Sequence, residues 1–124
     1  FKEIGKLDES FFAYYEDVDF SLRLKKHGYK IGFTPNTHLC HHESYSSISK
    51  NLKGGSLSPY VHYLNIRNHI LILKKHSDMF NYFGSRFFQI FKIISYSFYF
   101  ILKLRFIKLK MVYKGLIDSL SMKI

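Results

Sequence analysis

Three carboxylates lie close together near the start of the chain, directly after a run of aromatic residues. Residues 11–23 read FFAYYEDVDFSLR, and the acids among them are Glu16, Asp17 and Asp19. Acidic residues at the start of a helix are commonly capping groups that interact favourably with the helix dipole. A carboxylate that stays ionised can instead accept a proton as a general base. The cluster therefore fits both a structural cap and a catalytic base.

The pattern around these acids predicts a helix followed by extended chain. Basic residues end the helical pattern, and Gly28 follows them in the place where a left-handed residue often terminates a helix. We expect this helix to begin at about Glu16. Residues 29–34 then have the character of a short strand that ends at Pro35, and residues 37–42 of a second extended segment.

The rest of the chain has a loop pattern and then a helical one. Residues 43–58 are polar and rich in serine, which predicts a loop. Ser58 and Pro59 have the form of a helix start, with Ser as the cap and Pro in the first turn. We expect that helix to run to about Lys75, and the sequence from about Asn81 onward to be helical as well.

Positive charge is concentrated at the end of the chain. The formal net charge is +10, and residues 86–124 hold eight Lys and Arg residues against one acid, Asp118. Basic amphipathic segments of this kind bind anionic membrane surfaces. They can equally pack their apolar side on another domain. The longest uncharged stretch in this region, residues 93–102, is far shorter than the roughly 20 residues that span a bilayer as a helix.

An ordered series of residues along the first 75 positions resembles the C-terminal half of family 2 glycosyltransferases, and most closely rhamnosyltransferase-like members. Residues 114–120 resemble the family only loosely. The matched positions are Gly5, Asp8, Glu9, Phe11, Phe12, Tyr15, Glu16, Asp17, Val18, Asp19, Phe20, Arg23, Gly28, Tyr29, Pro35, His41, Tyr63, Arg67 and Asn68.

The resemblance implies an α/β fold and an enzymatic function. Residues 1–78 would be the acceptor side of a GT-A (Rossmann-like) catalytic domain, and residues 79–124 a basic tail of long amphipathic helices that contacts a membrane, chiefly through residues 86–124. The enzyme would transfer a sugar, with inversion, from a nucleotide-sugar donor to a saccharide or lipid-linked acceptor in bacterial surface polysaccharide synthesis. It would act in the cytoplasm at the inner face of the plasma membrane and would bind no nucleic acid. Because the nucleotide-binding half would be missing, we expect this excerpt to be inactive alone.

The resemblance also assigns roles to the acidic and aromatic residues. Asp17 occupies the position of the general base, which would take the proton of the acceptor hydroxyl. Asp8, Glu9, Tyr15 and Glu16 would shape the acceptor site or orient the base. A role of Asp8 and Glu9 in ordering the loop by hydrogen bonding is an equally good interpretation.

Two further roles concern the leaving diphosphate. The resemblance implies a divalent metal, Mn²⁺ or Mg²⁺, that neutralises the diphosphate, with His41 as a ligand. Lys53 and Arg67 are candidates for diphosphate binding. Arg67 could equally fix its helix to the carboxylate-bearing segment.

Two expectations about structure accompany these roles. Asp19 is one helical turn from Arg23, a spacing that favours an ion pair. In the aromatic run, we expect Phe11 or Phe12 to be buried, with Tyr14 or Tyr15 nearer the site.

A second hypothesis is a basic module without catalytic activity that binds an anionic membrane or nucleic acid through residues 86–124. The net charge supports it, and aromatic residues between the lysines could stack on bases. It gives no reason for the ordered series of residues in the first part of the chain.

Overall fold

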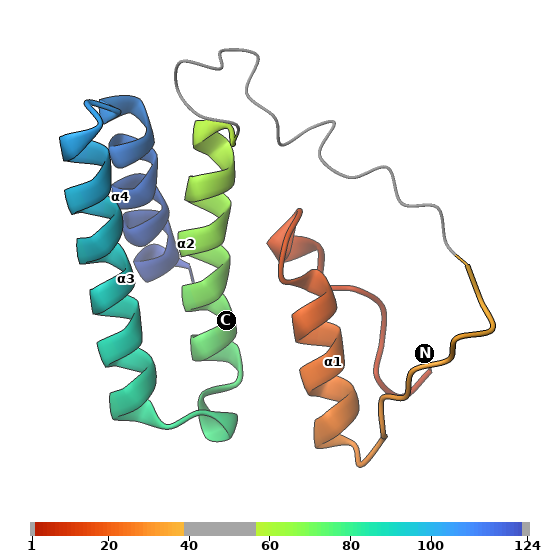
Figure 1. Ribbon diagram of the computed structural model, residues 1–124. Helices are drawn as coiled ribbons and strands as arrows, with labels where there is room; N and C mark the ends of the chain where they lie inside the picture. The colour runs from red at the N-terminus through yellow and green to blue at the C-terminus, as the bar shows by residue number, and fades with distance from the viewer. Residues whose placement is uncertain (1, 39–56, 123–124) are drawn as a thin grey trace.

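The structure is a computed structural model, and it describes residues 2–38 and 57–122. Within these two stretches every regular element is a helix (Figure 1). The four α-helices are α1 (Glu16–Lys26), α2 (Pro59–Lys75), α3 (Tyr82–Leu102) and α4 (Phe106–Ser121). Two short 3-10 turns, η1 (Glu9–Phe11) and η3 (Ser77–Met79), precede α1 and α3.

The predicted α/β fold is wrong, because the described residues form no strand and no sheet. The predicted strand at residues 29–34 is irregular, and each of its side chains is exposed. An isolated extended segment has no partner for its backbone groups, so alternation of side chains alone does not make a strand. Most of the second predicted segment, residues 37–42, lies outside the described residues.

The predictions for the first two α-helices are confirmed. α1 begins at Glu16, and Gly28 follows its end with φ +80°, in the left-handed region. α2 begins at Pro59 after Ser58, although the Ser58 side chain makes no capping hydrogen bond. Pro fits the first turn because the amide hydrogen that it lacks would have no partner within the helix.

The predicted helical tail is confirmed and consists of two helices, α3 and α4. α3 ends at Leu102, and the chain turns at Leu104, which has φ +51°. No helix in the described part of the chain is long and apolar enough to cross a membrane.

Helix α2 lies at the centre of the packing. On one side, Ile66 and Ile70 form a buried cluster with Phe100 of α3 and Val112 of α4. A second cluster joins Leu71 and Ile72 of α2 to side chains from the segment around α1, from the segment before α3 and from the residue after α4. Its other members are Phe11, Tyr15, Leu22, Phe80 and Met122. Figure 1 shows the same arrangement, with α3 and α4 beside α2 and α1 on its other side.

Helices α2 and α4 approach each other very closely at Gly115. A Cβ atom added at Gly115 would lie 2.5 Å from the backbone oxygen of Tyr63. Nearby, the Tyr63 hydroxyl donates a hydrogen bond of 2.9 Å to Asp118, and the Lys74 ammonium donates one of 2.6 Å to the carbonyl of Ser119. These contacts fix α4 along the length of α2.

Candidate functional site

The aromatic run before α1 has a strained backbone. Phe12, Tyr14 and Tyr15 have φ values of 59°, 65° and 73°. Residues other than glycine, and bulky ones in particular, rarely adopt positive φ, and each such residue costs about 1–3 kcal/mol. Strain of this kind persists only where surrounding contacts impose it.

Two neighbouring residues of α2 impose this conformation. The side-chain amide nitrogen of Asn68 lies 2.9, 2.8 and 2.8 Å from the carbonyl oxygens of Phe11, Ala13 and Tyr14. Asn68 is fully buried, and Arg67 donates to the carbonyl of Ser10. The aromatic turn is therefore attached to α2 through its own backbone.

One of the two phenylalanines in the aromatic run is buried, as the sequence predicts. Phe11 is fully buried, whereas Phe12 is 76 % exposed and contacts the ring of Tyr60 edge-on. Tyr15 is half-buried, with its ring centroid 5.9 Å from that of His69. Burial raises the pKa of Tyr15, with a smaller contribution from Tyr96.

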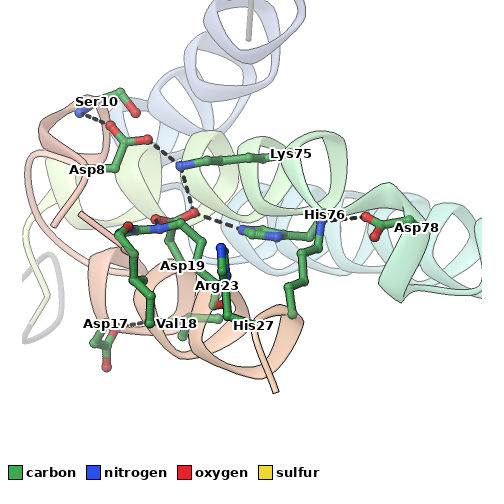
Figure 2. A network of polar contacts seen from close by, with 12 residues as sticks. Asp8, Ser10, Asp17, Val18, Asp19, Arg23, His27, Lys75, His76 and Asp78 are labelled. Carbon is green, nitrogen blue, oxygen red and sulfur yellow. Dashed lines mark hydrogen bonds and ion pairs between the residues drawn. The ribbon is translucent and has the colours of Figure 1, made fainter. Parts of the chain in front are cut away.

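Asp19 is the structural member of the carboxylate cluster. Its side chain is completely buried and accepts from Arg23 Nε at 2.8 Å, which confirms the predicted pair. It also accepts from Lys75 Nζ at 2.8 Å and from His76 Nε2 at 2.9 Å (Figure 2). Burial alone raises the pKa of Asp19, but the hydrogen bonds from Lys75, His76 and Arg23 outweigh it and the pKa is lowered.

Asp8 belongs to the same network. Its carboxylate accepts from Lys75 Nζ at 2.6 Å and from the backbone N–H of Ser10 at 2.9 Å, so it caps η1. Burial raises the pKa of Asp8, but the bonds from Lys75 and Ser10 lower it to about 2. These contacts fit the interpretation in which Asp8 orders the loop by hydrogen bonding. Glu9, the next residue, is exposed.

Asp17 and Glu16 are placed differently from Asp19. Asp17 is exposed, and its Oδ1 accepts a local bond of 2.8 Å from the N–H of Val18. Figure 2 shows its carboxylate pointing away from the Asp19 network. One carboxylate oxygen of Glu16, Oε2, is buried and has no hydrogen-bond partner in the described part of the chain. The first turn of α1 therefore presents one carboxylate to solvent beside another that is partly buried and unsatisfied.

The remaining predicted site residues are only partly placed. His41 and Lys53 lie outside the described residues. Arg67 donates to the Ser10 carbonyl and contacts the sulfur of Met122 at 3.4 Å. The contact with Ser10 fits the interpretation in which Arg67 fixes α2 to the carboxylate-bearing segment. Among residues 2–38 and 57–122, no three His, Cys, Asp or Glu side chains are grouped so that they could hold a metal ion.

Sequence reasoning missed the partners that come from the end of α2. Lys75 and His76 are more than fifty residues from Asp19, and a basic residue at a helix end has an ordinary explanation in the helix dipole. Asn68 belongs to the series of residues that resembles family 2 glycosyltransferases, but its sequence position does not reveal that its side chain contacts three carbonyl groups.

Comparison of the chain with family models, with curated proteins and with solved structures found no match. The functional argument therefore depends on the residues and their geometry.

Proposed function

We propose that this chain is the acceptor side of an inverting glycosyltransferase of the family 2 type and that Asp17 is its general base. The resemblance of the first 75 residues supports this proposal, and so does the site geometry. The nucleotide-sugar donor would be bound mainly by a nucleotide-binding half that the resemblance implies. A saccharide or lipid-linked acceptor would be bound near the aromatic turn.

The observation that carries the proposal is the construction of the turn before α1. Three strained aromatic residues, Phe12, Tyr14 and Tyr15, lie in a turn that Asn68 holds, and this turn leads directly into Glu16 and Asp17 at the start of α1. Strain held by a rigid scaffold is common at functional sites, because it fixes side chains that a relaxed loop would not. Capping alone does not require such a turn.

The chemistry assigned to Asp17 follows from its position. The first turn of a helix favours the ionised form of a carboxylate, and Asp17 is exposed to an incoming hydroxyl. As the acceptor oxygen forms its bond to the anomeric carbon, the hydroxyl proton passes to Asp17 and the bond to the leaving nucleoside diphosphate breaks. Glu16 lies beside it and would orient the acceptor by accepting a second hydroxyl hydrogen bond.

The divalent metal stays a prediction of the resemblance. Its expected ligand, His41, lies outside the described residues, and so does Lys53, the expected diphosphate-binding residue. No step proposed for Asp17 and Glu16 depends on the metal.

One specific observation favours the membrane part of the proposal. Large apolar side chains follow one face of α3 at helical spacing, and each is more than half exposed. They are Phe83, Phe87, Ile90, Phe91, Ile94, Phe98 and Ile101. The polar residue Gln89 instead bonds to His69 of α2, toward the interior. Exposed apolar area of this size marks an interaction surface, and the basic charge of residues 86–124 fits an anionic lipid surface.

The catalytic proposal is tested with Asp17→Asn in the protein that carries both halves. We expect sugar transfer to fall by at least 100-fold, since general base catalysis contributes about 10²- to 10⁴-fold. Donor binding, measured by calorimetry, should be unchanged. Asp78→Asn is the matched control, because Asp78 is an exposed carboxylate paired only with Lys26. Transfer that survives in Asp17→Asn would remove Asp17 from the role of base.

The membrane proposal is tested by sedimentation with vesicles that contain or lack anionic lipid. Phe87→Ser and Phe91→Ser together should reduce binding to the anionic vesicles. Tyr60→Ser is the control, because Tyr60 is an exposed aromatic residue that lies on α2 rather than on the α3 face. Equal binding of all variants would show that the α3 face is not the contact.

A further inference from the structure

A pocket at the corner between α3 and α4 gathers basic side chains, and no acid from the described part of the chain lines it. Its lining comes from the segment before α2, from α2 and α3, from the α3–α4 turn and from the first turn of α4. The residues are Leu57, His62, Tyr96, Tyr99, Phe100, Arg105 and Lys108. Its volume of about 320 Å³ is at the lower end of the range of small-molecule sites, roughly 300–1,000 Å³.

Lys108 is the unusual member of this pocket. It is only 5 % exposed, yet in the described part of the chain no group accepts a hydrogen bond from its ammonium and no carboxylate pairs with it. Buried lysines are almost always paired, because an isolated ammonium away from water is costly. Burial lowers the pKa of Lys108, and the neighbouring Arg105 lowers it further.

The position of these cations on α4 adds to the cost. Arg105 is the residue that precedes α4 and Lys108 lies in its first turn, which contains no acid. The positive end of a helix dipole favours anions, so two cations there are in the wrong place for stability. At this end the N–H of Arg105 bonds to the Phe100 carbonyl and that of Lys108 to the Arg105 carbonyl, so within the described residues the N–H groups of Phe106 and Ile107 are left without a backbone partner.

The surrounding residues hold the two cations in place. The Arg105 guanidinium donates to the Tyr99 hydroxyl at 3.2 Å and stacks over the Tyr99 ring at 5.6 Å. The turn that leads to Arg105 contains Leu104, a strained residue with φ +51° that is 74 % exposed. The site is therefore built from a locked arginine, a buried lysine and a strained turn.

We propose that this pocket binds a phosphate group, with Arg105 and Lys108 as its charged ligands. A phosphate group would accept hydrogen bonds from the Arg105 guanidinium and the Lys108 ammonium. Its negative charge would also interact favourably with the N-terminus of α4. The inference does not depend on sugar transfer. The phosphate could belong to a soluble compound or to a lipid headgroup.

The test measures thermal unfolding of the full chain while inorganic phosphate replaces chloride at constant ionic strength, because salt screens exposed charges. Phosphate should raise the midpoint of wild type, since a ligand of the folded state stabilises it. Lys108→Met should weaken phosphate binding by about 10- to 100-fold, the value of one charge-assisted hydrogen bond. Lys110→Met is the matched control, because Lys110 is exposed on the same helix.

The same variant separates binding from folding. Lys108→Met should be at least as stable as wild type without phosphate, since it keeps the buried aliphatic stem and removes an unpaired charge beside Arg105 at the start of the helix. A folded Lys108→Met protein that has lost the response, beside a Lys110→Met protein that keeps it, supports the site. A response that survives in Lys108→Met overturns the proposal.

Vesicles distinguish the two sources of phosphate. Binding that depends on Lys108 is compared for vesicles containing phosphatidic acid and for vesicles containing oleate at the same surface charge. A Lys108-dependent preference for phosphatidic acid, with no response to free phosphate, assigns the pocket to a lipid headgroup. A response to both assigns it to phosphate in general. No Lys108-dependent response to either phosphate source, or equal Lys108-dependent binding of oleate vesicles, overturns the proposal.

Discussion

Substitution by asparagine should lower the stability of the fold at Asp19 but not at Asp17. Asp19→Asn keeps the size of the side chain but removes its charge, and Asp19 is fully buried against Arg23, Lys75 and His76. Asp17→Asn makes the same change at an exposed carboxylate with one local bond. We expect the first change to destabilise the fold and the second to leave it intact.

The magnitude for Asp19 follows from its three charge-assisted contacts. Hydrogen bonds to a charged group contribute about 1.5–3 kcal/mol each, so the gross loss is roughly 4–9 kcal/mol. Lys75 keeps its bond of 2.6 Å to Asp8, and Arg23 keeps its bonds to the carbonyls of Ile4 and Lys6. We therefore expect a net loss of about 3–5 kcal/mol, the range for breaking a buried ion pair. Asp17→Asn should cost less than about 0.5 kcal/mol.

Urea denaturation followed by far-UV circular dichroism measures both effects on the free energy of unfolding. The pH dependence gives an independent check. Because the pKa of Asp19 is lowered by folding, its stabilisation is complete above its unfolded pKa near 3.8 and is lost as the pH falls through the lower, folded value. Asp19→Asn should remove this acid-dependent part. A loss below 1 kcal/mol for Asp19→Asn, or equal losses for both variants, would refute this account of the network.

Three other substitutions test separate parts of the fold. Asn68→Ala should lower the free energy of unfolding by about 2–4 kcal/mol, because three carbonyls of the aromatic turn lose a buried donor. Urea denaturation measures this loss, and a value below 1 kcal/mol would contradict the role of Asn68. Gly115→Ala should destabilise by about 1–3 kcal/mol, because its methyl group would collide with the Tyr63 carbonyl; an unchanged melting temperature would show that α2 and α4 can separate without cost. Burial, Lys108 and Arg105 lower the pKa of His62 to about 4. The free energy of unfolding should therefore fall by about 3 kcal/mol between pH 6.5 and about pH 4, because the unfolded chain binds a proton there that the buried ring does not. His62→Phe should flatten the stability curve in that window, to which His69 contributes in the same direction, and an unaltered slope would count against the burial of neutral His62.

The parts of the structure that were predicted depend on local sequence. The start of α1, its end at Gly28 and the Ser58–Pro59 start of α2 follow from groups that act within one helical turn. The Asp19–Arg23 pair is local for the same reason. In the aromatic run, hydrophobic area was enough to predict that one of two adjacent phenylalanines is buried.

The parts that were not predicted depend on contacts between distant segments. The strand predicted at residues 29–34 needed a neighbouring strand, and none of the described residues supplies one. The break at Leu104 is a left-handed turn at a residue with no sequence signal for it. Lys75 and His76 became partners of Asp19 only through the packing of α1 on α2. Lys108 could not be recognised as buried, because its surroundings come from three helices.

The position of α2 between two clusters has a consequence for shortened forms of this protein. Phe100 and Val112 cover Ile66 and Ile70, so a chain that stops before α3 would leave those two side chains in water. Each would lose about 1.5–3 kcal/mol of burial energy, a large share of what keeps a domain of this size folded. The opposite side of the same helix holds the aromatic turn through Asn68. A deletion of α3 and α4 would therefore also loosen the carboxylates at the start of α1.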